Sequence, residues 1–168
     1  MNVHTINKKT FELCSDGLQA EGRLMYSSDA FNNGIIEASQ SYELTRIATG
    51  VWTTSEKHNK DSKKTISSMR VETGGIISLK LTAKKTTYQF KKSAGWKLRF
   101  LLRNKDGEDL LSIIPIVNWQ KESHDFVLQV NEEFESECSP FLILQALHCA
   151  NCSLSMMTGG SVPALVSI

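Results

Sequence analysis

The chain has 168 residues, a length that suits one ordinary domain with its own buried core. It is 40% hydrophobic and 22% charged, with 3 Pro and 10 Gly, which excludes collagen-like, disordered and fibrous classes. The net charge of +1 conceals an asymmetry: residues 57–105 hold 14 Lys and Arg against 2 acidic residues, a net +12, and the rest carries −11. Such a split points to an anionic partner, although lysines also keep strands soluble and protect sheet edges.

Residues 1–10 are polar and carry Lys8 and Lys9 without an apolar core after them, so we expect a flexible N-terminal tail and no signal peptide. The longest apolar run, residues 141–150, is too short to span a bilayer. Four cysteines are too few for a secreted disulfide scaffold. We therefore expect a cytoplasmic protein without a transmembrane segment, at most peripheral to a membrane.

Strand patterns alternate with turn signals from residue 11 onwards. Phe11–Cys14 and Leu18–Ser27 predict strands separated by the turn pair Asp16-Gly17. Asn33-Gly34 predicts a hairpin turn, and residues 35–54 predict two strands broken near Gly50.

A charged loop is predicted over residues 56–64, and the strand pattern becomes sharper after it. Residues 69–83 predict a hairpin around Gly74-Gly75, and Trp96, Leu98, Phe100 and Leu102 alternate with other residues in the period-2 pattern of a half-buried strand. Residues 110–117 and 126–130 follow as strands, and Pro115 predicts a sheet edge or a bulge.

The hydrophobic period changes near the C-terminus. Ser139 is predicted to cap a helix that has Pro140 at its first position and runs to about residue 157. The helix is apolar over most of its circumference and must therefore be buried on most sides. Its polar sector holds Gln145, His148, Asn151, Cys152 and Ser155.

These patterns predict a mainly β fold with one C-terminal helix. We expect a single domain over residues 11–158, an antiparallel β-barrel or strongly curved meander around the hydrophobic helix at about 139–157. Residues 159–168 are expected to form a C-terminal tail.

Three segments resemble the tubby C-terminal-like superfamily, which includes the tubby, phospholipid-scramblase and LURP-one-related families. They are Gly95–Phe100 and Asp106–Leu110, similar to the penultimate hairpin of those proteins, and Ser139–Leu144, similar to the start of their central helix. The resemblance implies a closed antiparallel barrel around the helix. Tubby domains bind phosphoinositide headgroups through basic strand residues, but no stretch here matches that motif, so no site residue is transferred. The membrane-spanning terminal segment and cysteine-rich stretch of scramblases are also missing.

The basic strands are the candidate binding site. If the apolar residues of strands near 79–83 and 96–102 face inward, five cations face outward on one wall. They are Lys80, Lys84, Lys97, Arg99 and Arg103. This predicts a non-enzymatic binding module for an anionic phospholipid, or for a phosphorylated headgroup such as a phosphoinositide, that needs no cofactor, metal or catalytic residue.

Two alternatives stay open at this point. One is a lipocalin-like carrier of an apolar small molecule, and the other is a thiol or metal protein that uses Cys149 and Cys152 of the Cys149-Ala150-Asn151-Cys152 motif. One such motif supplies two ligands where structural zinc needs four, and buried cysteines often pack as small hydrophobes. A nucleic-acid partner is disfavoured because the basic block has no recognition motif and the aromatic residues are predicted to face inward.

Overall fold

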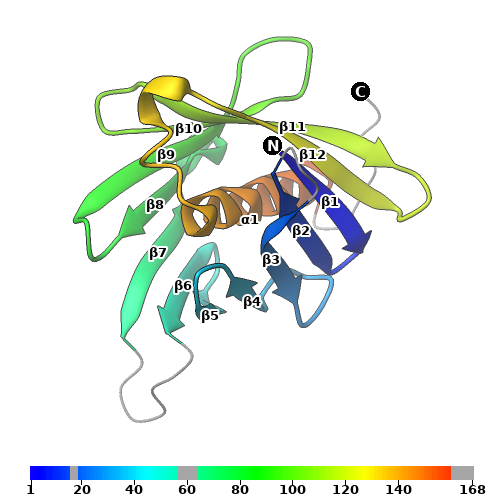
Figure 1. Cartoon of the computed structure of the whole chain (residues 1–168), viewed down its shortest axis with the longest axis horizontal. Coiled ribbons are helices and arrows are strands. Elements are labelled where there is room, and N and C mark those ends of the chain that lie inside the picture. Colours follow the sequence, from blue (N-terminus) through cyan, green and yellow to red (C-terminus); the bar gives the residue numbers. More distant parts are fainter. Residues whose placement is uncertain (16–18, 57–63, 160–168) are drawn as a thin grey trace.

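A computed structural model of the chain describes residues 1–15, 19–56 and 64–159. The predicted turn at Asp16-Gly17, most of the predicted loop over 56–64 and the predicted tail beyond Gly159 lie outside the described residues. Within them the chain forms a closed antiparallel barrel of twelve strands around a single α-helix, which confirms the predicted fold class (Figure 1). The strands are β1 Asn2–Asn7, β2 Thr10–Cys14, β3 Ala20–Tyr26, β4 Asn33–Glu37, β5 Ser41–Ala48, β6 Val51–Glu56, β7 Thr65–Val71, β8 Ile77–Leu81, β9 Thr86–Lys92, β10 Phe100–Arg103, β11 Asp109–Asn118 and β12 Ser123–Val130.

Each strand pairs with its neighbours in sequence, and the barrel closes between β1 and β12. Val3 of β1 lies opposite Phe126 of β12 and Leu13 of β2. The prediction of a flexible tail over residues 1–10 is therefore wrong for β1. Only Val3 and Ile6 are strongly apolar within β1, so its strand character depends on the two partner strands that offer unpaired backbone groups.

The region predicted as two strands over residues 35–54 contributes to three. A tight turn, in which the Ala38 amide donates to the Gln40 carbonyl over 3.0 Å, separates β4 from β5. The break at Gly50 is confirmed, since this residue has a φ of 69° between β5 and β6. The predicted hairpin around Gly74-Gly75 is also present, as β7 and β8.

The strand predicted to begin at Trp96 begins only at Phe100, because Pro115 stops its pairing. Phe100 lies opposite Ile113, so a longer ladder would place Leu98 opposite Pro115. The Asn131 amide donates to the Leu110 carbonyl, so even-numbered β11 residues bond to β12 and Pro115 faces the β10 side. Proline has no N–H for that bond. Trp96 accordingly lies in the β9–β10 connection and is 86% exposed, where an inward position was predicted.

The helix α1, Pro140–Met157, begins and ends as predicted. The Ser139 hydroxyl accepts from the Leu142 amide over 3.3 Å, and Pro140 occupies the first turn, where its missing N–H costs nothing. Every side chain from Leu142 to Leu154 is buried. Among the described residues, no helix is both long enough and apolar enough to cross a bilayer.

Contacts with strands on several sides place α1 inside the barrel (Figure 1). The Phe141 ring lies 4.3 Å from that of Tyr42 on β5, and Gln145 Nε2 donates to Thr54 Oγ1 on β6 over 2.8 Å. Cys149 Sγ lies 3.2 Å from the sulfur of Met69 on β7. The buried helix thus occupies the space that a lipocalin-like carrier leaves open for its ligand.

Candidate functional site at one end of the barrel

The two ends of the barrel are distinguished by the direction of α1. The end where the helix begins, here called the Pro140 end, carries the connections β2–β3, β4–β5, β6–β7, β8–β9 and β10–β11. The opposite end, the Met157 end, carries β1–β2, β3–β4, β5–β6, β7–β8, β9–β10 and β11–β12. Antiparallel strands joined by hairpins alternate between ends, so residues close in sequence can lie a full strand apart.

The five predicted site cations do not form one wall. Lys80 lies on the outer surface of β8, opposite Ser68 and Thr87. Lys84 is exposed in the β8–β9 turn at the Pro140 end, in which Ala83 is also exposed and not inward as predicted. Lys97 and Arg99 are exposed in the β9–β10 connection at the Met157 end.

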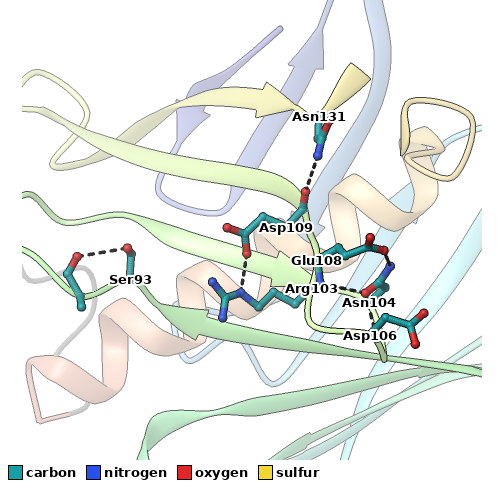
Figure 2. A network of polar contacts seen from close by, with 8 residues as sticks. Ser93, Arg103, Asn104, Asp106, Glu108, Asp109 and Asn131 are labelled. Carbon is teal, nitrogen blue, oxygen red and sulfur yellow. Dashed lines mark hydrogen bonds and ion pairs between the residues drawn. The ribbon is translucent and has the colours of Figure 1, made fainter. Parts of the chain in front are cut away.

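Arg103 at the Pro140 end is engaged within the protein. Its Nε forms an ion pair with Asp109 Oδ1, and the Asp109 carbonyl accepts from Asn131 Nδ2 over 3.0 Å (Figure 2). The neighbouring Asn104 side chain holds the β10–β11 connection, since its Oδ1 accepts from the amides of Asp106 and Glu108, each over 3.0 Å. Arg103 is thus part of a hairpin-stabilising network, and the Asp109 carboxylate compensates its charge.

The Met157 end gathers further cations that the sequence did not single out. Lys91 and Lys92 end β9 and line a groove of about 470 Å³ with Ser153 and Met157 of α1. The same end carries Arg46, Arg70 and Lys121. None of Lys91, Lys92, Lys97, Arg99 and Lys121 has a carboxylate partner within the described residues, and the Lys97 ammonium lies 5.0 Å from the centroid of the Trp96 ring.

Exposed apolar side chains lie in the same half of the barrel. Every large hydrophobic residue that is exposed in the described chain is found at, or in the strand halves next to, the Met157 end: Ile6, Ile47, Trp96, Ile116, Trp119, Met156 and Met157. Trp96 and Trp119 are 86% and 67% exposed, and they belong to connections that flank the neighbouring strands β10 and β11. Single exposed apolar residues are ordinary, but their confinement to one end is not.

Carboxylates at the Met157 end are mostly occupied. Glu122 forms an ion pair with Lys8, and Asp29 lies 3.7 Å from the Lys9 ammonium. Asp125 accepts from the Thr5 amide over 2.7 Å and from Asn118 over 2.9 Å. The Pro140 end holds the larger share of acidic residues, Glu37, Glu43, Glu56, Asp106, Glu108, Asp109, Glu132, Glu133, Glu135 and Glu137. The Pro140 end also holds Lys64, Lys84, Lys85, Arg103 and Lys105, so over the described residues it is net negative, whereas the Met157 end is net positive.

A buried polar cluster connects α1 to the barrel wall below the Met157 end. The Tyr26 hydroxyl lies 2.9 Å from His148 Nδ1, and Asn151 Nδ2 donates to the same hydroxyl over 3.2 Å. Burial lowers the pKa of His148 to about 3 and raises that of Tyr26, so both groups are neutral at physiological pH. Of the predicted polar sector of α1, the His148 ring and the amide nitrogens of Gln145 and Asn151 thus find partners inside the barrel, whereas Gln145 Oε1 has none among the described residues.

The thiols are arranged for packing and not for nucleophilic chemistry. All four cysteines are buried and unpaired. Burial raises the pKa of Cys138 to about 11 and those of Cys149 and Cys152 well above the usual range. Cys152 Sγ lies at similar distances, 3.8 and 3.7 Å, from the two ring nitrogens of His148, and the ring is neutral because burial lowers its pKa. Catalytic thiols require the opposite, a lowered pKa beside a cation or helix N-terminus.

No group of three or more His, Cys, Asp or Glu side chains that can hold a metal ion occurs within residues 1–15, 19–56 and 64–159. Comparison with family models, with curated proteins and with solved structures gave no match. The resemblance to the tubby superfamily therefore stays a prediction, and the function has to be argued from the site.

The candidate site that emerges consists of Lys91, Lys92, Lys97 and Arg99 with Trp96, Trp119, Met156 and Met157. Sequence reasoning found Lys97 and Arg99 but missed the remainder. Two signals were present: the adjacent lysines at the end of a strand, and a tryptophan directly after the turn signal Ser93-Ala94-Gly95.

Proposed function

We propose that this protein is a non-enzymatic module that binds an anionic membrane surface with the Met157 end of its barrel. The observation that carries the proposal is the coincidence of exposed apolar side chains with unpaired cations at a single end. A membrane surface is anionic at the headgroups and apolar beneath them, so it satisfies both kinds of side chain at once.

Tryptophan supports this orientation in particular. Its ring prefers the boundary between headgroups and acyl chains, and Trp96 and Trp119 are the most exposed large apolar side chains at this end. Met156 and Met157 add flexible apolar surface at the end of α1.

The cations supply attraction and orientation. Each Lys or Arg near an anionic membrane contributes about 1 kcal/mol, so Lys91, Lys92, Lys97 and Arg99 together support weak, salt-sensitive binding. The acidic Pro140 end is repelled by the same surface, which turns the Met157 end towards the bilayer.

Co-sedimentation with vesicles tests the proposal. We expect binding to phosphatidylserine-containing vesicles, little binding to neutral phosphatidylcholine vesicles, and weaker binding at physiological than at low salt. A third arm with phosphoinositide at matched total charge shows whether a phosphorylated headgroup is preferred. Equal sedimentation with neutral and anionic vesicles would contradict the proposal.

Two matched double charge reversals test which end of the barrel binds the membrane. Lys97→Glu with Arg99→Glu is expected to reduce binding about tenfold or more, since each reversal removes an attraction and adds a repulsion. Lys84→Glu with Lys85→Glu makes the same change of charge in the turn at the Pro140 end and should leave most of the binding intact. An equal loss in both variants would mean that net charge alone, and not this face, governs binding.

A further inference from the structure

A second feature of the Met157 end is a small pocket between the last turns of α1 and the barrel rim. It has a volume of about 290 Å³ and is lined by Phe31, Arg46, Trp52, Val71, Cys152 and Met156, together with small neighbours. We call it the Arg46 pocket. Its lining is apolar apart from the Arg46 guanidinium and a few hydroxyl groups.

Arg46 is held in place at the rim of this pocket. Its Nη1 donates to Asn32 Oδ1 over 2.8 Å, its Nε donates to the Ala48 carbonyl over 3.3 Å, and its guanidinium carbon lies 5.5 Å from the centroid of the Trp52 ring. It has no carboxylate partner within the part of the chain that the structure describes. A guanidinium fixed in this way keeps N–H groups available for an external anion.

The wall of the pocket stores backbone strain. Phe31 has a φ of 53°, an unfavourable value for a bulky side chain, yet it is buried. The Trp52 indole N–H donates to the Phe31 carbonyl over 3.0 Å, and the Phe31 ring lies 4.5 Å from that of Tyr26. Strained residues persist where the surroundings fix them, and they cluster at ligand sites.

From these contacts we infer that the Arg46 pocket binds a small monoanionic amphiphile, a medium-chain carboxylate, with its carboxylate on Arg46 and its chain among Phe31, Trp52 and Cys152. Arg guanidinium and carboxylate match as a two-pronged pair. The volume lies near the lower limit of small-molecule pockets, roughly 300 Å³, which favours a short chain over a long-chain fatty acid.

The dipole of α1 also favours placing the carboxylate of the ligand at the rim of the pocket. The negative end of a helix dipole repels an anion, and the pocket floor at Cys152 and Ser155 lies in the last turns of α1. The carboxylate is therefore stable only at Arg46, and the apolar chain takes the inner position.

This inference does not depend on membrane binding, and the experiment contains no vesicles. Trp52 is made the single tryptophan by Trp96→Phe and Trp119→Phe, both at exposed positions outside the pocket, so that its fluorescence reports on the pocket wall. Octanoate is titrated below its micellar concentration, beside octanol and octyltrimethylammonium, which share its chain but not its charge.

We expect a saturable change in Trp52 fluorescence with octanoate, a weaker one with octanol and none with the cation. Arg46→Gln should weaken octanoate binding about tenfold or more, as for the loss of a charge-assisted hydrogen bond. Arg70→Gln removes an exposed arginine from the same half of the barrel without touching the pocket and should have no effect. The inference is wrong if octanoate and octanol bind alike, if octanoate gives no change, or if the two arginine variants behave alike. The comparison of octanoate with octanol uses a protein that retains Arg46, so it tests the inference even if the arginine variants do not fold.

Discussion

The hydroxyl of Tyr26 on β3 and Nδ1 of His148 on α1 form a hydrogen bond of 2.9 Å in the interior of the barrel. Asn151 Nδ2 donates to the same hydroxyl, which leaves the hydroxyl hydrogen available for His148. The arrangement holds a neutral histidine, because burial lowers the pKa of His148. It links the central helix to the wall by a bond that acid can break.

Stability is expected to fall as the pH drops below 6.5. The pKa of His148 is lowered from 6.5 to about 3, and that of His124 is also lowered, in both cases chiefly by burial. The unfolded chain therefore binds more protons than the folded chain between pH 6.5 and 3, so the contribution is complete above 6.5 and is lost on acidification. Each histidine adds a slope of up to about 1.4 kcal/mol per pH unit. Urea unfolding at pH 7.5, 6.0 and 5.0 measures the slope of the unfolding free energy with pH.

His148→Gln should reduce this slope by up to about 1.4 kcal/mol per pH unit, the contribution of one proton. An unaltered slope in His148→Gln would show that the buried imidazole does not control the acid sensitivity.

Tyr26→Phe should destabilise the fold by about 1–3 kcal/mol, because it leaves buried His148 Nδ1 without this partner and Asn151 Nδ2 without this acceptor. Tyr42→Phe is the matched control, since its ring packs on Phe141 but its hydroxyl has no hydrogen bond within the described chain. Chemical denaturation of both variants gives the comparison. Equal losses would mean that the hydroxyl of Tyr26 adds nothing beyond packing.

The four cysteines should react slowly with a thiol reagent in the native protein at pH 8 and completely after unfolding. Their pKa values are raised by burial, so the thiolate fraction is small. Cys152, which lines the Arg46 pocket, should be modified before Cys149, which is fully buried. Rapid modification of either thiol at neutral pH would revive the alternative of a thiol protein.

Gly22→Ala is expected to destabilise the barrel strongly, by about 2 kcal/mol or more. A Cβ at this position would lie 2.6 Å from the Glu37 carbonyl oxygen and 2.8 Å from Leu144 Cδ1 of α1. Gly74→Ala provides a contrast, because nothing lies within 4 Å of its Cβ position and only its φ of 73° opposes the change. Thermal unfolding should show the larger loss for Gly22→Ala. The reverse order would argue against close packing of α1 on β3.

Much of the fold was predictable because it depends on local patterns. The alternation in β8, the turn at Gly74-Gly75 and the cap at Ser139 each involve residues that contact one another within a few positions. A helix as apolar as α1 has to be enclosed on most sides, and this favours a barrel around the helix over an open meander. β1 escaped prediction because it contains only two strongly apolar residues and one of its two partner strands, β12, lies more than a hundred residues away.

The candidate site was only partly predictable. Lys84 and Lys97 are separated by the single strand β9, so they must lie at opposite ends of an antiparallel barrel, a conclusion that the strand prediction already permitted. Trp96 could not be placed without knowing that Leu98 would face Pro115, and Arg103 could not be removed from the site without its ion pair to Asp109.

By itself the sequence determined the class of fold, the limits of the helix and the surplus of positive charge over residues 57–105. These follow from hydrophobic period, capping chemistry and composition, which are properties of neighbours along the chain. Only the tertiary structure decided which end of the barrel is cationic, which apolar side chains are left exposed there, and that Arg46 sits over Trp52 at the mouth of a pocket. Exposure and charge pairing depend on neighbours in space, and closure of the barrel brings together β3–β4, β5–β6 and the end of α1 from distant parts of the sequence.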